Sequence, residues 1–149
     1  MKKIDLALVD GEFENPLTKP IERPEQVAAI FNSIKDRAFE TLLAIYLRGD
    51  GTGVYDVHST GGISECLLSV YDLYGRAYVL RARTYILVHN HPNTGNAKPS
   101  RTDWKAIKRL GETESHEPTL EDFIIIGDKG DYWSWRNYVG DEDYRLGRT

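Results

Sequence analysis

The short apolar run Tyr85–Val88 places the strongest constraint on the fold, because it is compact and polar residues follow it at once. A run of this kind is typical of a buried central strand. The polar segment from His89 to Pro99 then predicts a loop, and Ser100 can cap a helix that continues to about Thr113. A central strand followed by a helix favours a layered domain in which helices cover a sheet.

Strand and helix patterns alternate along the rest of the chain. Hydrophobic spacing predicts a helix over residues 24–37, strands over 39–47 and 54–58, a helix from Ser64 to about Arg83, and a final hairpin of 123–126 with 132–135. No Gly or Pro stands at the boundary before residue 39, so one longer helix is an alternative there. The alternation indicates an α/β or α+β domain.

Length and composition set further limits. The chain has 149 residues, an ordinary size for a single domain, and its net charge of −4 disfavours a nucleic-acid-binding module. The single cysteine, Cys66, excludes an intramolecular disulfide and a cysteine-rich zinc site. No apolar run approaches the roughly 20 residues of a membrane span, and the first residues do not resemble a signal peptide. We therefore expect a cytoplasmic protein without a membrane partner.

Two histidines and an aspartate form the pattern with the clearest chemistry. His89 and His91 stand at i and i+2, so an extended chain projects both to the same side. Asp103 falls in the first turn of the helix that begins at Ser100. Two imidazoles and one carboxylate leave one position of a zinc ion open, as in catalytic zinc sites. The same set describes non-haem iron enzymes, and Ser-x-x-Asp alone is usually a helix cap.

These residues resemble the motif of the JAMM metalloproteases, also called JAB or MPN+, and most of all their RadC-like branch. Leu87–Pro92 and Pro99–Asp103 carry the motif, and the likeness extends from about Ile21 to Arg136. Ser59–Gly62 resembles the glycine–threonine segment of that branch, and Leu120–Gly127 resembles its final core strand.

The resemblance implies a three-layer α/β/α domain around a mixed sheet, over residues 21–136, between an N-terminal extension 1–20 and a C-terminal tail 137–149. It implies one zinc ion per chain and hydrolysis of a peptide or isopeptide bond. The expected substrate is a peptide or the C-terminal tail of a ubiquitin-like protein, and nucleic acid is not an expected partner. A non-catalytic metal-binding module in a DNA-repair or defence complex is the alternative function.

The resemblance also assigns roles to five side chains. His89, His91 and Asp103 would hold the zinc, Glu40 would be the general base, and Ser100 would donate to the oxyanion. From the residues alone, Glu40 is typical of an exposed strand end, because Glu is seldom buried without a partner.

Glu12, Glu14 and Glu65 are weaker rivals for the role of the base. Two features also depart from the RadC-like pattern. The loop from His91 to Ser100 is one residue longer, and Phe123 stands where that branch has histidine. We expect residues 93–98 to be more mobile than the flanking ligands. The extra residue should bulge outward and leave the metal geometry unchanged.

Overall fold

The computed structural model describes residues 15–17, 21–50, 52–60, 70–92, 96–111 and 117–140. In chain order the elements are β1 (Asn15–Pro16), α1 (Pro24–Ile30), the 3-10 helix η1 (Asn32–Asp36), β2 (Thr41–Leu47), β3 (Gly53–Thr60), α2 (Val70–Val79), β4 (Thr84–His91), α3 (Arg101–Gly111), β5 (Thr119–Gly127), β6 (Tyr132–Ser134) and α4 (Trp135–Val139). Within this part of the chain, no helix has the length and hydropathy needed to cross a membrane.

One mixed sheet forms the centre of the fold. Its six strands stand in the order β1-β3-β2-β4-β5-β6. β4 and β5 run parallel, with α3 in the connection between them, and all other neighbouring strands pair antiparallel. β2 and β4 lie in the middle of the order, and every residue of both strands is buried. These two strands therefore form the protected centre of the described sheet.

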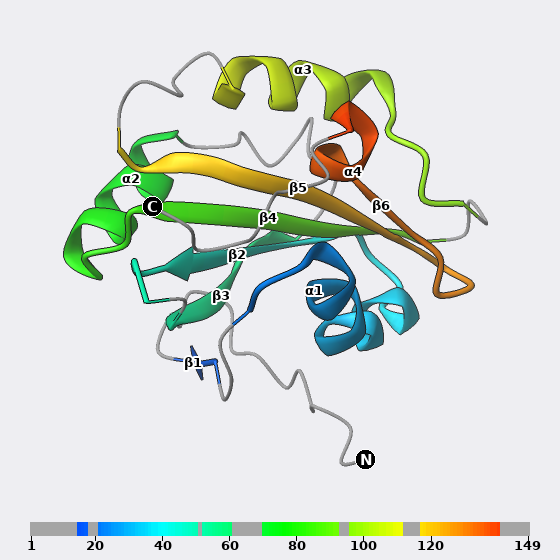
Figure 1. Ribbon diagram of the computed structural model, residues 1–149. Coiled ribbons are helices and arrows are strands. Elements are labelled where there is room, and N and C mark those ends of the chain that lie inside the picture. The colour runs from blue at the N-terminus through cyan, green and yellow to red at the C-terminus, as the bar shows by residue number, and fades with distance from the viewer. Residues whose placement is uncertain are drawn as a thin grey trace.

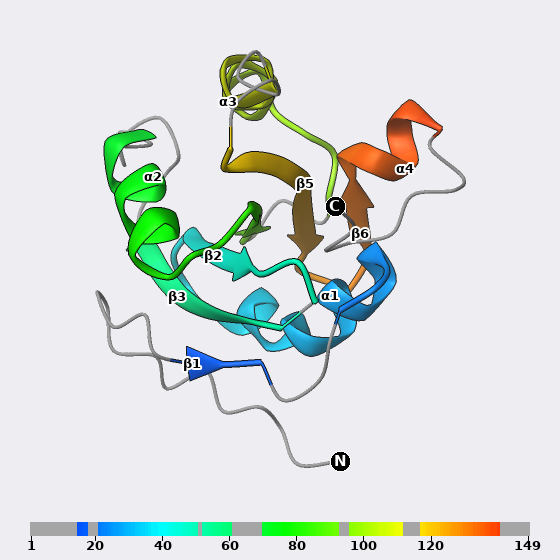
Figure 2. The same ribbon diagram turned by 60° about the vertical axis from the view of Figure 1, so that its left-hand side comes forward.

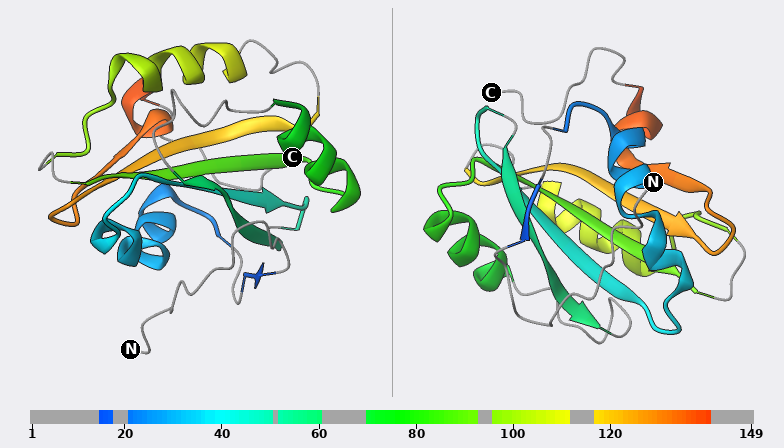
Figure 3. Two further views of the ribbon diagram at one scale, coloured as in Figure 1. Left: turned by 180° about the vertical axis from the view of Figure 1, so that it is seen from behind. Right: turned by 90° about the horizontal axis from the view of Figure 1, so that it is seen from below.

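Helices cover both faces of this sheet (Figures 1 and 2). α1 and η1 lie on one face and α3 and α4 on the other, as the views from behind and below also show (Figure 3). Alternate residues of β2 join different cores. Leu43 shares one core with Val27 of α1, and its neighbour Ala44 shares the other with Ile107 of α3. The three-layer α/β/α arrangement expected from the sequence is confirmed.

Two of the expected elements upstream of β3 differ in detail. The helix expected over residues 24–37 consists of α1 and η1, because the backbone of Phe31 leaves the α-helical region (φ −101°, ψ 14°). The strand expected over 39–47 is β2, which begins at Thr41 and is hydrogen-bonded to a strand on each side. The alternative of one longer helix is therefore wrong.

The largest difference concerns the end of β4. The predicted strand over 85–88 continues to His91, so the two histidines lie on the strand itself and not in a loop. In the final hairpin, Trp135 begins α4 and does not end β6. The first difference follows from tertiary contacts, because His89 and His91 are buried. The second follows from a local cap, in which Ser134 accepts a hydrogen bond from the amide of Asn137.

Some expectations fall outside the described residues. They are the start of the second long helix at Ser64, residues 93–95 of the longer His91–Ser100 segment, and the rival glutamates Glu12, Glu14 and Glu65. The described part of α2 lies within the helix expected there, and the strand expected over 54–58 is β3.

Candidate metal centre

β4 directs both histidines to the same face of the sheet. His89 lies opposite Leu42 of β2 and opposite Ile125 of β5, and Leu42 and Ile125 belong to the core beneath α2 and α3. Because side chains alternate along a strand, His91 shares this face and Asn90 points to the other. Both imidazoles are buried, with 2% and 7% of each residue exposed.

α3 supplies the third group from its first turn. The carboxylate of Asp103 is 1% exposed. Its Oδ2 accepts a hydrogen bond from the amide of Ser100 at 2.7 Å, and the amide of Asp103 donates to Ser100 Oγ at 3.1 Å. This reciprocal pair satisfies amides at the start of the helix, and it fixes the direction in which the carboxylate points.

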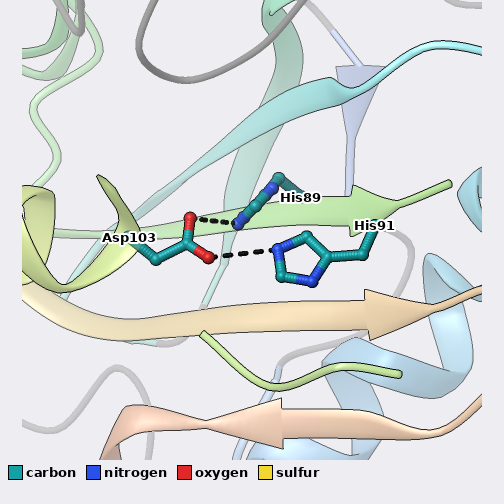
Figure 4. Close-up of side chains that lie close together, drawn as sticks. All are labelled: His89, His91 and Asp103. Carbon is teal, nitrogen blue, oxygen red and sulfur yellow. Dashed lines mark hydrogen bonds and ion pairs between the residues drawn. The ribbon is translucent and has the colours of Figure 1, made fainter. Parts of the chain in front are cut away.

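The three side chains meet above the sheet (Figure 4). His89 Nε2 lies 2.8 Å from Asp103 Oδ1, and His91 Nε2 lies 3.0 Å from Oδ2. One ligand atom from each residue can be chosen so that all lie within 4.8 Å of one another. The structure thus brings together the three residues that the sequence nominated as metal ligands.

The donor set fits a metal ion. Neither ring nitrogen of His89 makes a well-directed hydrogen bond within the described part of the chain, although Nε2 is close to Asp103. A buried imidazole without hydrogen bonds is costly. A cation between the three side chains would remove this cost for Nε2. Two imidazole nitrogens and a carboxylate oxygen are ligands that zinc and iron accept in proteins.

Electrostatics favour an anionic carboxylate in this group. Burial by itself would raise the pKa of Asp103, but its close contacts with the imidazoles of His89 and His91 outweigh it and hold that pKa well below its ordinary value. Burial also acts to lower the pKa of His91, yet the bond to Asp103, the backbone of Asn96 and the charge of Glu40 together raise it. The contact with Asn96 orients the imidazole, as second partners do for ligating histidines.

Glu40 directly precedes β2 and is half-buried. Leu42 pairs with His89 in the antiparallel register, and Glu40 lies two residues before Leu42, just outside the paired part of β2. Its charge acts on His91 in this position. The acid is thus beside the candidate ligands, and its role as a base stays a prediction.

Ser100 and Phe123 border the site in different ways. Ser100 is exposed, and its role as an oxyanion donor likewise stays a prediction. Phe123 packs its ring edge-on against His89, with centroids 5.5 Å apart and an angle of 71° between the rings. Phe123, which stands in place of the histidine of the RadC-like pattern, therefore supports the candidate ligand His89 through ring packing.

Asn90 is a residue that sequence reasoning misses. It is fully buried, and its side chain bonds to segments 49 and 56 residues earlier in the chain. The one local signal for this residue is its position between the two histidines. Side chains alternate along a strand, so the Asn90 amide faces the core on the opposite side of the sheet from the histidines.

Comparison with known proteins agrees with the fold. Residues 21–140 match the family described as the RadC-like JAB domain. The chain is 33% identical to a UPF0758 protein of Geobacter sulfurreducens over 108 residues, which are 70% of this chain and 47% of that protein. A UPF0758 protein of Streptococcus thermophilus is 30% identical over 146 residues, 96% of this chain and 62% of that protein.

A UPF0758 protein of Pelobacter propionicus is 34% identical over 115 residues, which are 75% of this chain and 49% of that protein. The chain spans about half the length of the Geobacter and Pelobacter proteins. From the family match and these identities, the chain belongs to the RadC-like JAB domain family.

Proposed function

We propose that the protein is a zinc-dependent peptidase of the JAMM type, in which His89, His91 and Asp103 hold the metal. The observation that carries the proposal is the buried group formed by these side chains, whose ligand atoms lie within 4.8 Å of one another. Membership of the RadC-like JAB domain family supports the same assignment. Imidazole nitrogen and carboxylate oxygen both suit zinc, which holds them at about 2.0–2.2 Å.

The chain's own residues would divide the chemistry between them. When bound, zinc would lower the pKa of a water molecule to about 7 and polarise the scissile carbonyl. Glu40 would accept a proton from that water and donate it to the leaving amine. The Ser100 hydroxyl would donate to the carbonyl oxygen as negative charge develops, a contribution of about 3–4 kcal/mol in other hydrolases. Ser100 Oγ accepts a bond from the amide of Asp103, and its own proton can still be donated.

The proposed substrate is a peptide or isopeptide bond at the extended C-terminal tail of a ubiquitin-like protein. This substrate class follows from the likeness to JAMM peptidases. An extended tail can bind beside a sheet by adding a strand, which aligns its backbone through main-chain hydrogen bonds.

A cleavage assay with matched variants tests the proposal. The zinc-loaded full chain is incubated with a ubiquitin-like protein joined through its C-terminus to lysine or to a peptide. Glu40→Gln keeps the shape of the side chain and removes the proton acceptor. We expect it to retain zinc, to lose about 10²–10⁴-fold in kcat and to change KM little.

Glu117→Gln is the matched control. Glu117 is exposed and forms an ion pair with Arg83. It lies just before the first residue of β5, whereas His91 pairs with the last residue of that strand, so Glu117 is remote from the candidate site. It should cleave at the wild-type rate, and a chelator should abolish cleavage by every variant. Cleavage by Glu40→Gln at the wild-type rate would show that Glu40 is misassigned.

Two further outcomes would replace the proposal. Iron in the purified protein, with oxygen-dependent turnover, would favour a non-haem iron enzyme. Failure of the zinc-loaded protein to cleave any conjugate or peptide, even with partners from its own genomic neighbourhood, would favour a non-catalytic metal-binding module.

A further inference from the structure

The side chain of Asn90 bonds to the chain on both sides of Glu40. Asn90 Oδ1 accepts a hydrogen bond from the amide of Thr41 at 2.7 Å. Its Nδ2 donates to the carbonyl of Phe39 at 3.2 Å and to the carbonyl of Ile34 at 2.9 Å. The Phe39 carbonyl belongs to the peptide group before Glu40, and the Thr41 amide belongs to the peptide group after it. One amide side chain therefore holds both peptide groups that flank Glu40.

The segment around Glu40 has little regular structure of its own. η1 ends at Asp36 and β2 begins at Thr41, so residues 37–40 lie outside helix and strand. The side chain of Phe39 is 73% exposed and does not anchor the segment in the core. The bonds to Asn90, which is fully buried, therefore add to the few backbone hydrogen bonds of this segment, such as the one from the Arg37 amide to the Ile34 carbonyl.

We propose that Asn90 is a positioning residue, which fixes the backbone at Glu40 relative to His89 and His91. Alternation along β4 makes this possible, because the histidines face Asp103 while the residue between them faces the segment that carries Glu40. A single tripeptide, His-Asn-His, then sets the positions of two of the three candidate metal ligands and of the base. The catalytic meaning of this positioning rests on the proposed function, in which Glu40 is the general base.

Hydrogen exchange of the full-length, zinc-loaded protein tests the positioning without any substrate. In the wild type, the Thr41 amide should exchange slowly although it lies at the end of a strand. In Asn90→Ala, peptides covering residues 37–42 should exchange about tenfold faster or more, because two buried hydrogen bonds and one part-buried hydrogen bond are lost. About one zinc per chain should remain, since Asn90 does not face the ligands.

Ser134→Ala is the matched control. Ser134 is 2% exposed and donates a buried hydrogen bond to Asp122 at 2.6 Å, on strands β5 and β6. It should destabilise the fold by a comparable amount and leave exchange over residues 37–42 unchanged. Equal exchange in this segment for Asn90→Ala and the wild type would overturn the proposal, and so would rapid exchange of the Thr41 amide in the wild type.

If the wild type cleaves the conjugate, the rate of cleavage supplies a second readout. Asn90→Ala should lower kcat by about 10²-fold with little change in KM, because a misplaced base affects the transition state. Combined with Glu40→Gln, it should cost no more than Glu40→Gln alone. Multiplicative losses in the double variant would overturn the positioning role. Absence of cleavage by the wild type would count against the proposed function, while the exchange results would still decide the role of Asn90.

Discussion

Ser100 and Asp103 hydrogen-bond to each other in both directions, with Ser100 N donating to Asp103 Oδ2 at 2.7 Å and Asp103 N donating to Ser100 Oγ at 3.1 Å. A Ser-x-x-Asp pattern is usually explained as a helix cap. Here the same carboxylate also reaches His89 and His91. Capping and metal binding are therefore compatible uses of one side chain, and the cap helps to hold the carboxylate toward the imidazoles.

Two substitutions should separate these uses. Asp103→Asn keeps the shape of the side chain but removes the anionic ligand, so it should abolish tight zinc binding. Ser100→Ala should retain zinc and lower the free energy of unfolding by about 1 kcal/mol, the usual cost of a lost helix cap. Elemental analysis after dialysis and urea unfolding of the metal-free proteins measure the two effects. Full zinc occupancy in Asp103→Asn would contradict the assignment.

The histidines should be equally necessary for the metal. The wild type should bind about one zinc per chain, and His89→Ala or His91→Ala should each abolish tight binding, because two ligands remain. Zinc at 100 times its dissociation constant should raise the free energy of unfolding of the wild type by about 2.7 kcal/mol and leave the variants unchanged. Thermal unfolding with and without zinc gives this comparison. Retention of one zinc by the His89→Ala/His91→Ala double variant would locate the metal elsewhere.

The candidate ligands could be identified from the sequence because their relationships are local. His89 and His91 share a face through the two-residue period of a strand, and Ser100 and Asp103 share a helical turn. A strand followed by a crossover helix brings these two local patterns together, and the resemblance to a known family supplied the position of Glu40.

The end of β4 and the role of Asn90 could not be found in this way. Residues 89–91 are polar, so hydrophobic pattern ends the strand at Val88, whereas the structure continues it to His91. Burial of these residues depends on Asp103, 12 residues beyond His91, and on Thr41, 49 residues before Asn90. Partners at such distances leave no periodic signal in the sequence.

Asp122 should make the free energy of unfolding decrease as the pH rises, which is the opposite of the usual effect of a carboxylate. Its carboxylate is fully buried and accepts hydrogen bonds from Ser134 Oγ at 2.6 Å and from the amides of Phe123 at 2.7 Å and Arg136 at 3.1 Å. Burial outweighs these bonds and raises the pKa of Asp122 to about 6. The folded state therefore holds this proton more tightly than the unfolded state does. Its contribution to stability is largest below pH 4 and falls as the pH rises from about 4 to about 6.

Asp122→Asn should remove this dependence. The amide can still accept from the two backbone amides and can donate to Ser134. A difference of about 2 between the pKa values of the two states corresponds to about 3 kcal/mol. The variant should therefore gain up to about that amount over the wild type between pH 4 and pH 7, as measured by urea unfolding of the metal-free proteins. Other titrating groups are common to both proteins, and a difference that does not vary with pH would contradict the prediction.

Gly127 and Asp131 adjoin the site at the end of β5. Gly127 lies opposite His91 in the parallel pair, and the Asp131 carboxylate accepts a hydrogen bond from the amide of Ala97 at 3.0 Å. Ala97 belongs to the loop that leads from His91 to Ser100, so Asp131 anchors this part of the longer loop. A Cβ atom at Gly127 would lie 2.8 Å from Asp131 Cγ, which is too close for a normal contact.

A double-mutant cycle should detect this crowding. Gly127→Ala should lower the free energy of unfolding by about 1–3 kcal/mol, because the added methyl group displaces Asp131 and breaks its bond to Ala97. Asp131→Ala should cost about 1 kcal/mol through the same lost bond. Once Asp131 is truncated, the methyl group has space and the bond is already absent, so Gly127→Ala should add little further loss. Urea unfolding of the four proteins measures the coupling, and strictly additive losses would show that Gly127 is required for another reason.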